Sequence, residues 1–167
     1  MPTASSQSLH EAINIEAMGR PDKIAIDAWN TTITYTQLKE LSDYLSRILI
    51  GQGVKKGSIV PIISEKSGYV PVAALAVLKS GAAFMPLDAS LPLNRMKEIV
   101  GQVNPDLVLS ADSTYSIATK LQLRVICIEE SFQNTTKPTD PLQHRMTVEP
   151  YDIACILFTS GSTGKPK

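Results

Sequence analysis

The sequence predicts an α/β fold, a doubly wound and mostly parallel sheet with helices packed on both faces. From residue 58 onward, short apolar segments of strand length alternate with segments in which apolar residues recur at helical spacing. The connections between these segments are short, as expected for parallel strands joined by helical crossovers. A chain of 167 residues, 43% of them hydrophobic, is long enough for one domain with its own core.

The elements before residue 58 are indicated by turn and capping residues. Trp29 and Asn30 separate two short segments of strand composition, which is a hairpin pattern. Thr34 and Gln37 have the spacing of a capping box, so a helix is expected to begin there and to end near Gly51. In chain order, we expect an amphipathic helix at 9–18, strands at 23–28 and 31–35, and a helix at 35–50.

The alternating region contains two prolines that its elements must accommodate. Pro71 would lie in the first turn of a helix, where its missing N–H costs no hydrogen bond. Pro61 would lie within a strand. The region is expected to contain strands at 58–63, 82–87, 106–110 and 124–128, and helices at 68–80, 92–102 and 113–121.

Two further segments follow. Residues 131–150 contain Pro138, Pro141 and Pro150 among Asn, Thr and Asp residues, which favours an irregular crossover on the surface. Residues 153–158 are all apolar and have the length of a fully buried strand.

Composition excludes several kinds of partner. The chain has 16 Lys and Arg against 16 Asp and Glu, so no basic field favours a nucleic acid or an anionic membrane. The apolar stretch 70–87 is interrupted by Lys79, glycine and proline, which favours a buried helix and strand over a membrane span. Neither the two cysteines nor the two histidines have the spacing of a metal or disulfide framework. No segment resembles a signal peptide, so we expect a cytoplasmic protein.

The end of the chain has the composition of a phosphate-binding loop. Gly161 and Gly164 would let backbone N–H groups turn toward an anion, while hydroxyls and lysines supply further donors and charge. The nucleotide-binding P-loop is excluded, because only two residues separate these glycines and Lys165 precedes Pro166. A glycine- and serine-rich linker would share this composition. The candidate anion-binding residues are Thr159, Ser160, Gly161, Ser162, Thr163, Gly164, Lys165 and Lys167.

Three motifs carry a resemblance to a known family. TSGSTGKPK, residues 159–167, closely resembles the phosphate loop of the adenylate-forming (AMP-binding) superfamily, which contains acyl-CoA ligases, luciferases and the adenylation domains of nonribosomal peptide synthetases. ITYTQLKEL, residues 33–41, looks like the first adenylation motif with Gln37 in place of Glu. VLKSGAAFMPLDASLPLNRMKEI, residues 77–99, is similar to the peptide synthetase form of a second motif. The chain most resembles the N-terminal part of a peptide synthetase adenylation domain.

The resemblance implies the chemistry of a larger enzyme. Such enzymes use ATP with Mg²⁺ to convert an amino acid or other carboxylic acid into an acyl-adenylate. In peptide synthetases the acyl group then passes to the phosphopantetheine of a carrier protein. The motifs for adenine, ribose and Mg²⁺ and the catalytic lysine are not among these 167 residues. We therefore assign no catalytic residue, and we expect residues 1–167 to be an N-terminal fragment that is inactive alone.

Two alternatives stay open, namely a stand-alone, non-catalytic nucleotide- or anion-binding module and a fragment of an acyl-CoA ligase. Within the second motif, the residues are expected to pack rather than to bind. Lys79 to Gly81 would end a helix, and Arg95 would be a solvated or salt-bridged helix residue.

Overall fold

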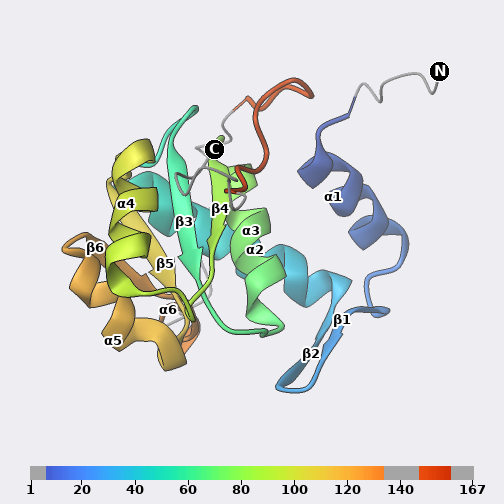
Figure 1. The fold of residues 1–167 in the computed structure, drawn as a ribbon. Helices are drawn as coiled ribbons and strands as arrows, with labels where there is room; N and C mark the ends of the chain where they lie inside the picture. Colours follow the sequence, from blue (N-terminus) through green and yellow to red (C-terminus); the bar gives the residue numbers. More distant parts are fainter. Residues whose placement is uncertain (1–6, 134–146, 159–167) are drawn as a thin grey trace.

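The structure, a computed structural model, describes residues 7–133 and 147–158. Its N-terminal part consists of two helices and an antiparallel hairpin that turns at Trp29 and Asn30, as predicted (Figure 1). The predicted capping box is present, since Thr34 N–H donates to Gln37 Oε1 at 2.9 Å and Gln37 N–H donates to Thr34 Oγ1 at 3.3 Å. These elements are α1 (Leu9–Gly19), β1 (Ile24–Ala28), β2 (Thr31–Thr34) and α2 (Tyr35–Gly51).

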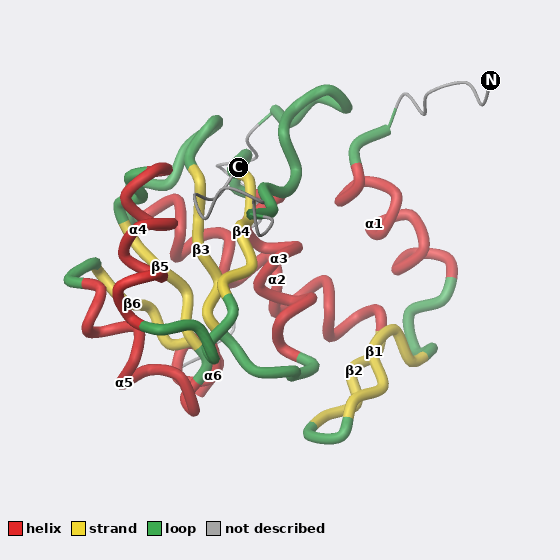
Figure 2. Tube along the Cα trace, in the orientation of Figure 1, coloured by secondary structure: helices red, strands yellow, loops and turns green. Residues whose placement is uncertain are grey.

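Four parallel strands form the central sheet in the order β4-β3-β5-β6 (Figure 2). β3 precedes both of its neighbours in sequence, so the chain first crosses to one side of β3 and then to the other, which is the doubly wound topology. The strands are β3 (Ile59–Ile63), β4 (Ala83–Leu87), β5 (Leu107–Ser110) and β6 (Arg124–Cys127). The helices are α3 (Tyr69–Lys79), α4 (Leu93–Val103), α5 (Tyr115–Ala118) and α6 (Ile128–Gln133), with the 3₁₀ turns η1 (Asp112–Thr114) and η2 (Thr119–Leu121).

Helices cover both faces of this sheet. Buried side chains of α2 and α3, such as Leu45 and Val77, pack on one face together with Ile128 of α6. On the other face, Met96 of α4 and Ala118 of α5 pack against the same strands. Each large apolar side chain buried in this way contributes about 1.5–3 kcal/mol. The predicted fold class, a parallel sheet between two helical layers, is confirmed.

Pro61 shortens the contact between β3 and β5. Proline has no N–H to donate, and β5 pairs with β3 only at Ile62 and Ile63, beyond the proline. Thr114, which is 1% exposed, reinforces this short contact by donating its hydroxyl to the carbonyl of Ile63 at 2.7 Å. The N–H of Ala111 donates to the same carbonyl at 3.1 Å. The carboxyl end of β3 is therefore held by the segment that follows β5.

Two segments differ from the predicted elements. Residues 113–121, predicted as one helix, form η1, α5 and η2 in succession. The tie between Thr114 and β3 constrains the first turn, and Gln122 ends the segment with a φ of 61°. Residues 128–133 form α6. The sequence analysis placed residue 128 at the end of a strand and residues 131–133 at the start of an irregular segment. The ring of Phe132 on this helix lies 5.6 Å from that of Tyr69, a long-range contact that stabilises a short helix.

The apolar stretch 70–87 divides into α3 and β4, as predicted. Gly81 in the turn between them has a φ of 79°, and a Cβ there would lie 3.3 Å from Lys56 Cα, so the turn requires glycine. Among the described residues, no helix has the length and apolar character needed to cross a membrane.

The hairpin is tied to the loop that follows β3. Trp29 Nε1 donates to the carbonyl of Lys66 at 2.9 Å. Asn30 donates to Ser67 Oγ at 2.9 Å and accepts a hydrogen bond from the N–H of Gly68 at 3.1 Å. These contacts connect the N-terminal hairpin to the carboxyl edge of the sheet.

An ion pair joins α2 to α3. Lys79 Nζ, on a side chain that is 7% exposed, donates to Asp43 Oδ1 at 2.6 Å and to Ser42 Oγ at 2.7 Å. Lys39 Nζ lies 2.8 Å from the other oxygen of Asp43. Burial favours a higher pKa for Asp43, but hydrogen bonds from Lys39 and Lys79 outweigh it and hold the pKa below its usual 3.8. Lys79 therefore packs between two helices, as predicted.

Replacing Asp43 with Asn should lower the free energy of unfolding at pH 7, because the buried ammonium of Lys79 would lose its counter-charge. We expect a loss of about 1–3 kcal/mol, less than for a fully buried pair because Asp43 is 22% exposed. Since folding lowers this pKa, the stabilisation is complete above pH 3.8 and is lost as the pH falls through the folded-state value. Urea unfolding curves of the two proteins should differ at pH 7 and converge in acid. Glu40→Gln, an exposed change on the same helix, is the control, and a loss that is equal at every pH would contradict this account.

Gly68→Ala should destabilise the protein through overpacking. A Cβ at Gly68 would lie 2.5 Å from Thr31 Cγ2 and 3.1 Å from Ala28 Cβ, so the hairpin would have to move at a cost of about 1–3 kcal/mol. In Gly51→Ala the added methyl group meets nothing within 4 Å, and this control should be neutral or stabilising. Thermal unfolding of the two variants makes the comparison. Equal Tm values for the two variants would mean that the hairpin leaves room for a Cβ at Gly68.

Candidate functional site

The carboxyl ends of the parallel strands lie at one edge of the sheet, which is where doubly wound proteins bind ligands. The segments that leave this edge are 64–68 after β3, 88–92 after β4 and 111–114 after β5. In the second of these, Asp88 accepts a hydrogen bond from the N–H of Ser90 at 2.8 Å, which orders the turn and lowers the pKa of Asp88. Arg95 in the following helix pairs with Glu98 at 3.0 Å, as predicted for a salt-bridged surface residue.

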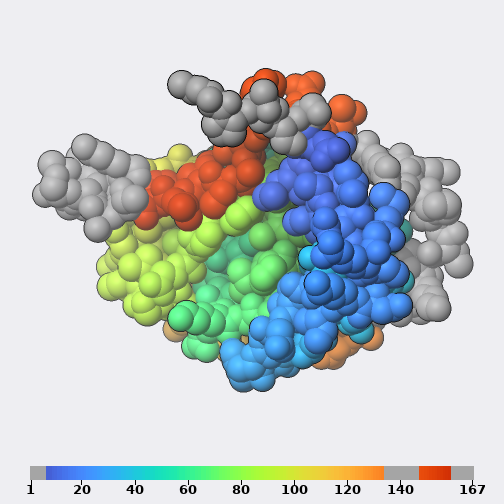
Figure 3. Space-filling model, turned by 90° about the vertical axis from the view of Figure 1, so that its right-hand side faces the viewer, coloured from blue at the N-terminus to red at the C-terminus, as the bar shows by residue number. Residues whose placement is uncertain are grey.

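Residues 154–156 add to this sheet beside β4. Phe84 N–H donates to the carbonyl of Ala154 at 3.0 Å, and Ile156 N–H donates to the carbonyl of Phe84 at 3.0 Å, in a parallel bridge. Figure 3 shows the segment in orange and red, lying on the green part of the surface near the blue N-terminal helix. The segment joins the sheet as predicted, but it makes an isolated bridge rather than the predicted strand over 153–158.

The predicted complete burial of this segment is wrong. Ile153 is 68% exposed and Leu157 is 67% exposed. The segment lies at the edge of the sheet and makes one bridge, so only one of its sides packs against the protein. Cys155 in its centre is half-buried, and burial raises the pKa of its thiol.

The bridge also sets the direction in which the segment runs. Phe84, the second residue of β4, pairs with Cys155 in an isolated parallel bridge. Phe158 packs against the apolar cluster that contains Leu87. A parallel segment runs in the same direction as β4, so it leads toward the carboxyl edge. The next residue in sequence, Thr159, is the first of the predicted phosphate loop.

The predicted anion-binding residues lie outside the described residues, and their role stays a prediction. They are Thr159, Ser160, Gly161, Ser162, Thr163, Gly164, Lys165 and Lys167.

An ion pair holds the start of the segment that leads to this loop. Lys56 Nζ lies 2.8 Å from Asp152 Oδ2, and the same carboxylate oxygen accepts a hydrogen bond from the N–H of Glu149 at 2.8 Å. The hydrogen bond from Lys56 lowers the pKa of Asp152, and the carboxylate in turn raises the pKa of Lys56. Residues 149–152 are thus anchored to the turn that precedes β3.

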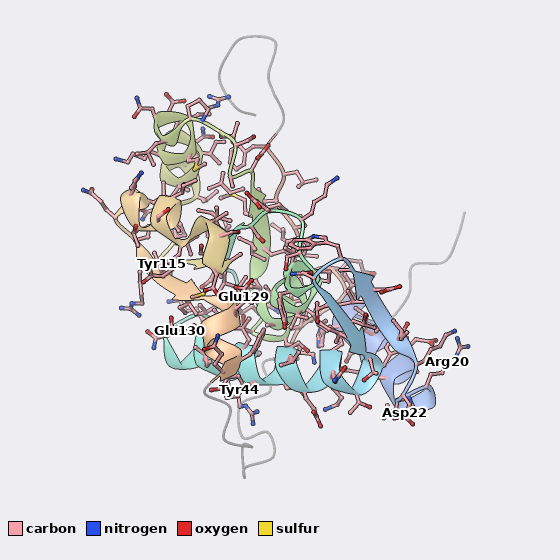
Figure 4. All side chains as sticks on the ribbon, turned by 90° about the horizontal axis from the view of Figure 1, so that it is seen from below. Arg20, Asp22, Tyr44, Tyr115, Glu129 and Glu130 are labelled. Carbon is pink, nitrogen blue, oxygen red and sulfur yellow. The ribbon has the colours of Figure 1, made fainter. Side chains whose placement is uncertain are left out.

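A cluster of two carboxylates and a thiol lies at this edge, and the sequence analysis did not predict it. Asp112 opens η1, Cys127 ends β6 and Glu129 lies in the first turn of α6, next to the helix that carries Tyr115 (Figure 4). Cys127 Sγ donates to Asp112 Oδ1 at 2.8 Å and lies 3.8 Å from Glu129 Oε2. Burial and the bond to Asp112 raise the pKa of Cys127 to about 11, so the thiol is protonated at neutral pH. The sequence did contain a signal for this cluster. Asp112 closely follows the predicted strand 106–110, and Glu129 closely follows the predicted strand 124–128.

Comparisons with known proteins agree with the motifs and the fold. The sequence model of the AMP-binding enzyme family matches residues 14–167. Cyclochlorotine synthetase of Talaromyces islandicus is 46% identical over 168 residues, which cover 100% of this chain and 3% of that protein. The chain therefore spans a small part of this much longer relative.

Solved structures show the same likeness. The N-terminal subdomain of Klebsiella oxytoca NpsA, in complex with 3-hydroxyanthranilyl-AMSN, has a TM-score of 0.81 and 28% identity, over 96% of this chain and 39% of that one. The nonribosomal peptide synthetase FmoA3, in its α-methyl-L-serine-AMP bound form, has a TM-score of 0.85 and 25% identity, over 100% of this chain and 18% of that one. The chain belongs to the AMP-binding enzyme family and is most like the N-terminal part of a nonribosomal peptide synthetase adenylation domain.

Proposed function

We propose that this chain is the phosphate-binding N-terminal part of an adenylation domain. The parent enzyme would activate an amino acid or other carboxylic acid with ATP and Mg²⁺ and transfer the acyl group to the phosphopantetheine of a carrier protein. The observation that carries the proposal is the parallel bridge between Cys155 and Phe84, which directs the chain toward the carboxyl edge four residues before TSGSTGKPK begins at Thr159. The family match through residue 167 supports the same assignment. A cytoplasmic location is part of the proposal.

The donors of residues 159–167 suit the phosphates of ATP. Backbone N–H groups at glycines, short hydroxyls and two lysines can neutralise the charge of leaving pyrophosphate, and phosphoryl chemistry depends mainly on such positioning and charge neutralisation. The domain division proposed with it is an N-terminal fragment over 1–167, a crossover segment predicted over 131–150, of which residues 131–133 belong to α6, and the phosphate loop over 159–167. No residue of this chain is proposed to be catalytic.

The alternatives are weaker on specific grounds. An acyl-CoA ligase fragment would share the loop, but the second motif, residues 77–99, has the peptide synthetase form, and the similar structure FmoA3 is a nonribosomal peptide synthetase. A stand-alone anion-binding module needs no more than the loop and the sheet edge. That module differs from the proposal in one measurable respect, because it would bind nucleotide as the isolated 167-residue chain.

The 167-residue chain should show no amino-acid-dependent exchange between ATP and pyrophosphate. The groups that the family uses for adenine, Mg²⁺ and ribose are not in this sequence, so the acyl-adenylate would have no complete site. Radiolabelled pyrophosphate exchange with pools of amino and aryl acids measures this directly, against a heat-inactivated sample. Exchange above that background would overturn the fragment assignment.

In a full-length peptide synthetase containing this chain, Lys167→Ala or Thr163→Ala should slow adenylate formation by about 10²–10³-fold, the usual effect of losing one preorganised donor. Lys97→Ala, which removes an exposed lysine from α4, is the matched control and should leave the rate unchanged. Single-turnover measurements separate this step from later thioester transfer. A loss below about threefold in the loop variants would mean that the loop does not hold pyrophosphate.

A further inference from the structure

The topology of β5 and β6 brings three metal-binding side chains together at the carboxyl edge. Ser110 and Cys127 are register partners in these parallel strands. Asp112 lies two residues beyond Ser110, and Glu129 lies two residues beyond Cys127, so both carboxylates follow the strands at the same level. The N–H of Asp112 also donates to Glu129 Oε2 at 3.1 Å, which turns the second carboxylate toward the first.

The distances among the donor atoms suit a single small cation. One ligand atom from each of Asp112, Cys127 and Glu129 lies within 4.8 Å of the others. Tetrahedral coordination with metal–sulfur and metal–oxygen bonds of about 2.3 and 2.0 Å requires a sulfur–oxygen separation of about 3.5 Å. The observed separations of 2.8 and 3.8 Å lie on either side of this value, so small side-chain rotations would complete the geometry.

The charge of the cluster points the same way. Within residues 7–133 and 147–158, the ion pairs of basic side chains involve Glu16, Asp43, Glu98 and Asp152, and none involves Asp112 or Glu129. Two carboxylates thus face a thiol that is 6% exposed, with a single S–H proton between them. Burial, together with the two carboxylates, disfavours the thiolate, and a divalent cation held by the three side chains would favour it.

We propose that Asp112, Cys127 and Glu129 form a binding site for a divalent cation of the zinc class. A thiolate ligand selects such ions over Mg²⁺ and Ca²⁺, which prefer oxygen ligands alone. Asp112 is exposed and Glu129 is half-buried, so the ion can enter from solvent, and water can fill the fourth position. The site binds its ion whether or not the adenylation chemistry proposed above takes place.

Co²⁺ is a suitable probe, because a cobalt–thiolate bond has a near-ultraviolet charge-transfer band. Titration of the 167-residue chain in excess Mg²⁺ should develop this band to one equivalent of Co²⁺, and Zn²⁺ should abolish it by displacement. Cys127→Ser should lose the band. Cys155→Ser, which removes the other free thiol, is the matched control and should keep it.

Asp112→Asn and Glu129→Gln keep the thiol and change side chains that are not fully buried, so they test the site even if Cys127→Ser fails to fold. Each should weaken Zn²⁺ binding by at least about tenfold in isothermal titration calorimetry, with an unchanged circular dichroism spectrum. Absence of the band in the wild-type chain, its loss in Cys155→Ser, or unchanged affinity in both carboxylate variants would overturn the proposal.

Discussion

The burial of β3 on both of its faces is the constraint on which the rest of the structure depends. Successive residues of a strand point to opposite faces, and β3 directs Val60 and Ile62 toward α2 and α3 but Ile63 toward α4. Neither helical layer can leave the sheet without exposing part of this strand, at about 1.5–3 kcal/mol for each large side chain. The topology follows from this burial, because both neighbours of β3 must reach it by crossovers on opposite faces.

The carboxyl edge gathers polar groups for a related reason. Strands end there, and the last buried carbonyls need partners that the sheet no longer supplies. The carbonyl of Ile63 finds them in the N–H of Ala111 and the hydroxyl of Thr114, while Asp112 and Glu129 meet around Cys127. Phe158, the last described residue before the predicted phosphate loop, packs against the apolar cluster that contains Leu87. The contacts that stabilise the carboxyl edge and the candidate binding groups therefore come from segments that lie side by side at this edge.

Sequence reasoning succeeded where the determinants are local. The capping box depends on Thr34 and Gln37, three positions apart, and the turn at Gly81 depends on the positive φ of that one residue. It failed where contacts join distant segments. Thr114 and Ile63 are 51 residues apart, and their hydrogen bond constrains the start of a segment that forms η1, α5 and η2 instead of one helix. The exposure of residues 153–158 depends on what lies beside them, and apolar composition alone indicated only burial. The Asp112 cluster requires β5 and β6 to be neighbours in register.

The exposed edge next to β4 has a consequence for the chain in solution. Within the described residues, no strand pairs with the outer side of 154–156, where Ile153 and Leu157 present apolar side chains. An open, apolar strand edge is a template for pairing with a second chain. A formal net charge of zero provides no long-range repulsion to keep two chains apart. An exposed apolar edge of this kind favours association, so a segment that covers it would also make the protein more soluble.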